Sequence, residues 1–161
     1  MLKVGDPIHF AGYWQDFMNA RSYPDERRGL PLKAAPSLRK SVGGMKRQTA
    51  EKVLDYVRSG DVPIAQMSGW ADDPLEDHPP AKTPSDPLPW TNDDLYVGDA
   101  TDGVWVWPRY LSYFIARYRV TLPKAFVTHA VERIDGGSRG PAIPRERMDE
   151  IMRVLGWGGP N

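Results

Sequence analysis

The sequence predicts a helix-rich α+β fold, a single domain over residues 1–161 with about five helices and a small antiparallel sheet. Its length of 161 residues suits one hydrophobic core. Its content of 40% hydrophobic and 11% aromatic residues is typical of a folded chain rather than a disordered one. Apolar residues recur at helical spacing in five segments, whereas the strand signals are sparser and shorter.

The first helix is expected over residues 7–20. Asp6 and Pro7 are typical of an N-cap and a first turn, and an apolar stripe follows at helical spacing, formed by Phe10, Tyr13, Trp14, Phe17 and Met18. The second helix is expected to begin at Thr49 and to end at Ser59 and Gly60; its inward residues are Val53, Leu54 and Val57.

Three further helices are expected to begin at prolines, because proline favours the first helical turn. Pro108 begins the third helix, Pro123 the fourth and Pro144 the fifth, and glycines follow the last two at positions 136–137 and 156. Their inward faces are apolar and consist of Leu111, Phe114, Ile115 and Tyr118 in the third, Phe126, Val127, Ala130, Val131 and Ile134 in the fourth, and Met148, Ile151, Met152 and Leu155 in the fifth.

Strands are expected over residues 62–67, 95–97 and 104–107. The last two are separated by residues 98–103, a glycine-bounded stretch that is typical of a hairpin turn. Asp99 and Asp102 are expected to form Asx turns in it. Trp105 and Trp107 alternate with valines, so one pair is expected to face the helices and the other to be partly exposed.

Composition excludes several classes of function. The 21 basic residues cancel the 21 acidic ones, so no overall field attracts nucleic acid or an anionic membrane. The absence of cysteine excludes disulfides, thiolate nucleophiles and thiolate metal sites. No apolar run approaches about 18 residues and the first residues do not resemble a signal peptide, so a soluble cytoplasmic protein without a membrane partner is expected.

Few residues offer catalytic chemistry. The three histidines, His9, His78 and His129, fall in three different predicted elements, so neither a metal site nor a cofactor is expected. The stretch Gly43-Gly44-Met45-Lys46 lacks the first glycine and the hydroxyl residue of a phosphate-binding loop. The enzymatic alternative is a small hydrolase that uses His129 with a loop carboxylate.

Charge is unevenly distributed along the chain. Residues 21–47 hold eight basic and two acidic residues, whereas residues 71–102 hold nine acidic residues and one basic residue. Two interpretations of the segment Arg21–Arg47 stay open: it lies against the acidic stretch within the fold, or it is a nucleic-acid-binding module. The balance of charge and the single aromatic residue of the segment, Tyr23, favour the first, so no nucleic-acid partner is expected.

The acidic stretch begins with a long loop over residues 71–94. Six prolines exclude a helix or a central strand there, and loops of this length are commonly functional. A stiff acidic surface with tryptophans at its two ends suits a basic protein partner. The residues expected to contact that partner are Trp70, Asp72, Asp73, Glu76, Asp77, Trp90, Asp93 and Asp94.

One motif resembles a known pattern. The run Thr101-Asp102-Gly103-x-Trp105-x-Trp107-Pro108-x-x-Leu111-x-Tyr113, followed by Tyr118-x-Val120-x-Leu122-Pro123-x-x-Phe126, resembles small bacterial immunity proteins that are often encoded beside polymorphic secreted toxins. The resemblance covers about residues 49–134, with departures at Tyr110, Phe114 and Arg119. It implies a non-enzymatic immunity protein that binds and neutralises a cognate toxin by direct contact. From the residues themselves, the motif is interpreted as a fold signature rather than an active site.

Overall fold

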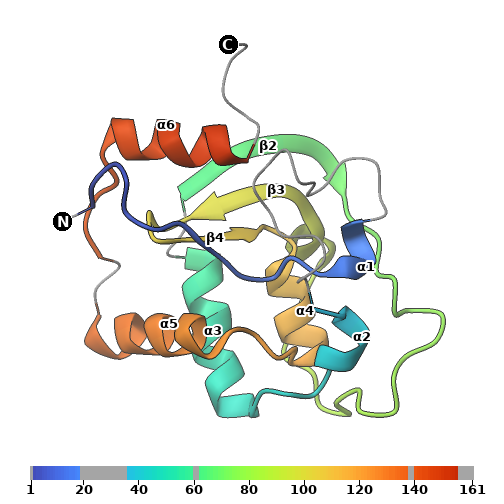
Figure 1. Ribbon diagram of the computed structural model, residues 1–161. Coiled ribbons are helices and arrows are strands. Elements are labelled where there is room, and N and C mark those ends of the chain that lie inside the picture. The colour runs from blue at the N-terminus through green and yellow to red at the C-terminus, as the bar shows by residue number, and fades with distance from the viewer. Residues whose placement is uncertain (1, 19–35, 60–61, 138–139, 156–161) are drawn as a thin grey trace.

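The computed structural model describes residues 2–18, 36–59, 62–137 and 140–155. It is an α+β fold in which helices pack on both sides of a four-stranded sheet (Figure 1). The elements in chain order are β1 (His9–Phe10), α1 (Gln15–Met18), α2 (Leu38–Ser41), α3 (Arg47–Ser59), β2 (Val62–Trp70), the 3-10 helix η3 (Asn92–Leu95), β3 (Tyr96–Thr101), β4 (Trp105–Pro108), α4 (Leu111–Tyr118), α5 (Lys124–Gly136) and α6 (Arg145–Val154). The predicted fold class is confirmed.

The small antiparallel sheet that the sequence predicted is present in three strands, and a fourth strand makes the sheet mixed. Its strand order is β1-β4-β3-β2; β2, β3 and β4 are antiparallel neighbours, and β1 runs parallel to β4. The parallel strand, β1, lies within residues 7–20, where the sequence predicted one continuous helix. Gly12 breaks that helix with a φ of 83°, so Phe10 pairs with Val106 in the sheet and only Gln15–Met18 is helical.

The hairpin between β3 and β4 is confirmed, but its turn is shorter than predicted. Strand β3 includes Gly98, and the chain turns at residues 102–104, where Gly103 has a φ of 95°. Asp102 forms the expected Asx turn, since its Oδ1 accepts hydrogen bonds from the backbone N–H groups of Val104 (2.9 Å) and Trp105 (2.8 Å). Asp99 does not, because it lies buried in β3 and accepts from the Tyr13 hydroxyl at 2.7 Å.

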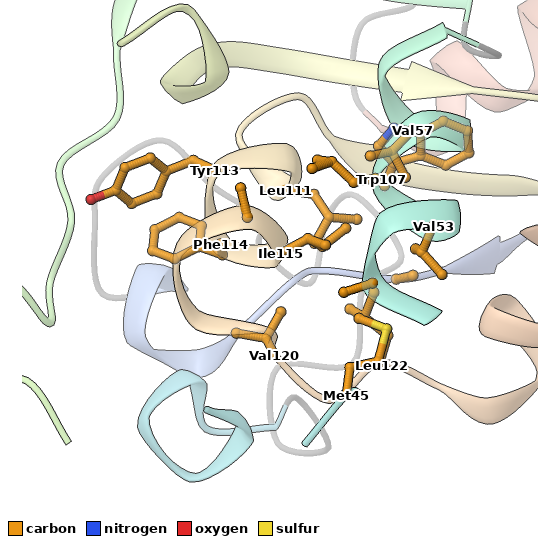
Figure 2. Packing of buried hydrophobic residues seen from close by; sticks show 14 of the residues in the cluster. Met45, Val53, Val57, Trp107, Leu111, Tyr113, Phe114, Ile115, Val120 and Leu122 are labelled. Carbon is orange, nitrogen blue, oxygen red and sulfur yellow. The ribbon is translucent and has the colours of Figure 1, made fainter. Parts of the chain in front are cut away.

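Both faces of β4 are covered, contrary to the prediction of a partly exposed face. Trp105 and Trp107 belong to the main core with α3, α4 and α5 (Figure 2), while Val106 packs on the opposite side against Ile151 and Leu155 of the α6 region. The sheet therefore lies between two helical layers. None of the described helices has the length and hydropathy of a membrane span.

Three of the five predicted helices lie where the sequence placed them: α3, α5 and α6. Gly137, with a φ of 66°, is the C-cap of α5, and the short helix α2 was not predicted. Pro108, predicted to begin a helix, instead ends β4, and α4 begins three residues later at Leu111. Every residue of α4 except Arg117 is buried, so this helix forms the centre of the core.

The N-terminal segment is fastened to α6 by one buried arginine. The Arg147 side chain is fully buried and donates to the backbone carbonyls of Asp6 (2.6 Å), Pro7 (2.9 Å) and Gly103 (3.0 Å). Its remaining partner is the Glu150 carboxylate at 2.7 Å. The charge is thus compensated within the fold, as a buried guanidinium requires.

The Gly43-Gly44 pair has a packing role. This segment runs beside residues 118–121, with Gly43 N–H donating to the carbonyl of Tyr118 at 2.8 Å and Thr121 N–H to that of Ser41 at 2.6 Å. A Cβ atom on Gly44 would lie 1.5 Å from Thr121 Oγ1 and 2.8 Å from its Cβ. Close approach of two backbones explains the glycine.

We expect Gly44→Ala to lower the free energy of unfolding by about 2 kcal/mol, because the added methyl must push the two segments apart. The matched control is Gly136→Ala at the end of α5, where a Cβ meets nothing within 4 Å; its effect should stay within about 1 kcal/mol. Urea unfolding followed by tryptophan fluorescence measures both. Equal stability of Gly44→Ala and the wild type would contradict the close packing.

Candidate functional site

The acidic loop was predicted over residues 71–94, but its last three residues form part of η3, so the connection from β2 to η3 covers residues 71–91. This connection is held to the fold at several points. The side chains of Leu75 and Leu88 are buried in the core, and Leu88 N–H donates to the carbonyl of Ala116 at 2.8 Å. Asp86 pairs with Arg119 and lies 3.6 Å from Arg47. The loop is therefore a positioned surface, as its prolines predicted.

A groove of about 410 Å³ opens where this loop meets α4 and η3. Five of the eight predicted contact residues line it together: Trp70, Asp72, Asp73, Glu76 and Trp90. The other lining residues are Ala71, Asn92, Leu95 and Tyr113, which sequence reasoning did not select. We call this feature the Trp70–Trp90 groove.

The two tryptophans present unusual exposed apolar surface. Trp70 is 56% exposed and Trp90 36%, and among the described residues only Val4 is a comparably exposed large hydrophobic residue. Trp70 stacks on Tyr96 with ring centroids 5.4 Å apart, and Trp90 meets the Tyr113 ring at 4.8 Å. Each indole is thus braced from behind while part of it faces solvent, an arrangement typical of binding hot spots.

Asp73 has a different role from the one predicted, because its carboxylate faces inward. Its side chain is 2% exposed, and Oδ2 accepts from the hydroxyls of Tyr113 (2.6 Å) and Tyr118 (2.5 Å). Arg117 Nη1 lies 3.1 Å away and donates to the same oxygen. Burial, followed by these contacts with Asp73, raises the pKa of both tyrosines. Asp73 therefore ties the loop to α4.

Three predicted contact residues do not line the groove. Asp94 forms a capping box with Thr91 at the start of η3 and pairs with Arg58 at 2.9 Å. Asp77 and Asp93 are exposed. Like Asp72 in the groove, these two carboxylates form no ion pair with any part of the chain that the structure describes.

The C-terminal end of the basic segment, residues 43–47, lies against the acidic loop. Arg47 lies against Asp86, and a Cβ on Gly43 would contact the carbonyl oxygen of Lys82 at 2.9 Å. Residues 19–35, which hold Arg21, Arg27, Arg28 and Lys33 of this segment, lie outside the described residues. The other arginines that neutralise the loop come from elsewhere in the chain: Arg58, Arg117 and Arg119.

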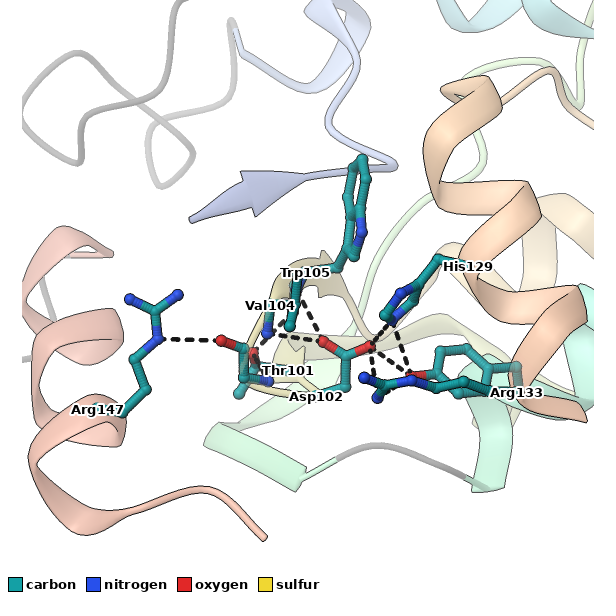
Figure 3. Close-up of polar contacts among 9 residues, drawn as sticks. Thr101, Asp102, Val104, Trp105, His129, Arg133 and Arg147 are labelled. Carbon is teal, nitrogen blue, oxygen red and sulfur yellow. Dashed lines mark hydrogen bonds and ion pairs between the residues drawn. The ribbon is translucent and has the colours of Figure 1, made fainter. Parts of the chain in front are cut away.

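A second polar cluster lies around Asp102, away from the groove (Figure 3). The Asp102 side chain is 1% exposed, and its Oδ2 accepts from the Tyr56 hydroxyl and lies 2.7 Å from His129 Nε2. Arg133 Nη1 is 3.6 Å from the same oxygen and donates to the Tyr56 hydroxyl at 3.1 Å. The other oxygen, Oδ1, accepts from the two backbone N–H groups of the Asx turn. Both carboxylate oxygens of Asp102 are therefore engaged in contacts within the protein.

The electrostatics of this cluster favour the ionised carboxylate. Burial alone raises the pKa of Asp102, but the hydrogen bonds from His129, Tyr56 and the backbone outweigh it and hold that pKa below its ordinary value. Burial and the neighbouring carboxylate raise the pKa of Tyr56. The cluster thus joins α3, the hairpin and α5 through one buried charge.

The histidines do not form a metal site in the described part of the chain. His129 contacts Asp102 rather than a carboxylate of the acidic loop, His9 stacks against Trp105 at 5.0 Å, and His78 is exposed. Among the described residues, no three carboxylate or imidazole groups are placed to hold a metal ion. His129 has the partner that a catalytic dyad requires, but it does not line the groove.

Comparison with known proteins adds no relative: no family model matches the chain, and no curated protein or solved structure is significantly similar to it.

We expect Asp102→Asn to lower the free energy of unfolding at pH 7 by about 3 kcal/mol, because it removes the charge that several buried donors surround. Since the folded pKa is lowered, this stabilisation exists above the unfolded pKa of about 4 and is lost as pH falls through the folded value. The difference in free energy of unfolding between the wild type and Asp102→Asn should therefore become smaller as the pH falls. Chemical unfolding from pH 7 to pH 3 measures it.

The matched control for Asp102→Asn is Asp77→Asn, which removes an exposed carboxylate with no ion pair in the described structure. It should change stability by less than about 0.5 kcal/mol at every pH. An Asp102→Asn protein as stable as the control would show that the cluster does not hold the fold together.

Proposed function

We propose that this protein is a non-enzymatic immunity protein, which neutralises a bacterial toxin by direct contact through the Trp70–Trp90 groove. The observation that carries the proposal is the pairing, in one groove, of exposed indole surface with three carboxylates that share a single arginine among the described residues. An exposed apolar patch of this kind marks an interaction site, and the carboxylates favour a basic partner.

The resemblance of the Thr101–Phe126 region to toxin-associated immunity proteins supports the same proposal, although its conspicuous residues serve the fold. Trp105, Trp107 and Phe126 are buried in the main core, and Asp102 is enclosed by its donors. The motif supplies a scaffold, and the surface that meets a toxin is the loop outside it. This division is typical of folds that carry a variable binding loop on a fixed core.

The loop is also prepared for binding at low entropic cost. Its prolines, its buried leucines and the anchoring of Asp73 fix its course before a partner arrives. Binding then has few side chains and little backbone to order, which leaves more of the interaction energy for affinity. The charges of Asp72, Asp77 and Asp93, which have no ion pair within the described residues, would steer a basic toxin toward this surface.

The direct experiment begins with capture of partners by the tagged protein from its source lysate. A stoichiometric partner supports the proposal if its expression alone kills cells and co-expression of this chain restores growth. A captured protein that is harmless alone, or growth that this chain does not restore, contradicts the proposal.

With that toxin in hand, the double variant Asp72→Lys/Glu76→Lys is expected to bind it at least about tenfold more weakly, because the groove then repels a basic surface. Glu132→Lys, an exposed reversal on α5, is the matched control and should bind as the wild type does. Calorimetric titration at two salt concentrations measures both. Unchanged affinity of the double variant would remove the groove from the interface.

The contact between His129 and Asp102 makes the hydrolase the second candidate, and it predicts a different result. We expect His129→Gln to protect cells from the toxin as well as the wild type does, since the amide of glutamine can also donate to Asp102 and position 129 lies outside the groove. A hydrolase with His129 as its base would lose protection. Growth is compared at matched protein levels, and lost protection would favour the enzyme.

A further inference from the structure

We infer that the Trp70–Trp90 groove receives an arginine side chain of the toxin. This inference rests on the proposed function and names the chemical group that the groove recognises. Three features carry it: the aromatic surfaces, the excess of carboxylates, and a guanidinium that the same residues already hold.

The aromatic surfaces suit a flat cation. Tyr96 stacks on one face of Trp70 with an interplanar angle of 19°, so the 56% exposure of this residue leaves the opposite face and the edges accessible. Trp90 and Tyr113, which also line the groove, meet nearly at right angles, 78°. The electron-rich faces of such rings attract a cation placed over them.

The protein's own Arg117 shows that these residues accommodate a guanidinium. Its central carbon lies 5.4 Å from the Trp90 ring centroid, and it lies 5.8 Å and 5.3 Å from those of Tyr113 and Tyr118. Its Nη1 contacts the buried carboxylate of Asp73 at 3.1 Å. A ring face together with a carboxylate is the combination that the open groove offers again, with Trp70 and its neighbour Asp72.

The lining of the groove carries an excess of negative charge. Three carboxylates line it, from Asp72, Asp73 and Glu76, and Arg117 pairs with two of them, those of Asp73 and Glu76. Asp73 is fully engaged, Glu76 is 67% exposed and only 3.8 Å from Arg117, and Asp72 has no ion pair within the described residues. An occupant with a positive charge would reduce this excess from two negative charges to one, whereas an anion would meet two carboxylates.

Arginine fits better than lysine for a physical reason. The guanidinium is planar and weakly hydrated, so it can lie flat on the Trp70 ring while its N–H groups reach a carboxylate in two-point contact. An ammonium group is compact and strongly hydrated, and in a groove that stays open to water it would keep most of its solvent. The shape of the lining therefore selects the flat cation.

The test uses small probes and the full-length protein. Nα-acetyl-arginine methylamide and its uncharged isostere Nα-acetyl-citrulline methylamide are titrated into ¹⁵N-labelled protein, and the indole N–H signals are followed. We expect arginine to shift the signals of Trp70 and Trp90 in a saturable way, at least about tenfold more tightly than citrulline. The buried rings of Trp14, Trp105 and Trp107 are internal references and should not move.

Variants locate the effect. Asp72→Asn/Glu76→Gln keeps the shape of the groove and should weaken arginine binding about tenfold, as should Trp70→Ala, whereas Glu132→Gln on α5 should leave it unchanged. Equal shifts with arginine and citrulline, equal affinity for Nα-acetyl-lysine methylamide, or no shift of either groove tryptophan would each overturn the inference.

Failure of the inference is separable from failure of the proposed function. If arginine does not bind but Asp72→Lys/Glu76→Lys abolishes protection from the toxin, the groove contacts the toxin through another group and only the inference is wrong. If arginine binds the groove but the charge reversal leaves protection intact, the groove is a cation site outside the toxin interface, and the inference that the arginine belongs to the toxin is wrong.

Discussion

The fold depends on one buried carboxylate, that of Asp102. It stands in the turn between β3 and β4, where two backbone N–H groups fix the turn, and it reaches Tyr56 on α3 and His129 on α5. A buried charge without these donors would be far more costly than a neutral group, so the four partners must assemble together. The hairpin, α3 and α5 are consequently set relative to one another by electrostatics as well as by the packing of the indoles around them.

Asp73 acts in a similar way at the start of the acidic loop, and it lines the groove. Its contacts with Tyr113, Tyr118 and Arg117 pull the start of the acidic loop onto α4 and leave Trp90 beside Tyr113. The carboxylate of the adjacent Asp72 is exposed and has no ion pair within the described residues. Two aspartates that look alike in the sequence therefore differ in the structure, since one is buried against α4 and the other faces solvent.

Local signals allowed the sequence to predict α3, α5, α6 and the Asx turn of Asp102, because caps, glycine stops and apolar spacing act within a few residues. The long loop and five lining residues of the groove followed from prolines, charge and tryptophan positions. What could not be predicted is non-local: β1 pairs with a strand far along the chain, and the partners of Asp73 lie 40 or more residues away. The apolar stripe of residues 10–18 led to a wrong prediction of one helix. The chain turns at Gly12 instead, and this turn buries Tyr13 and Trp14 just as a helix would have done.

The parallel pairing of β1 with β4, and the grip of Arg147 on the carbonyls of Asp6 and Pro7, impose an order on folding. During synthesis β1 emerges long before its partner strand β4, and Arg147 on α6 emerges later than both. The hairpin, α3, α4 and α5 are joined by contacts that are closer in sequence, so these contacts can form before β1 joins the sheet. The β1 edge of the sheet can be completed only after α6 has been made.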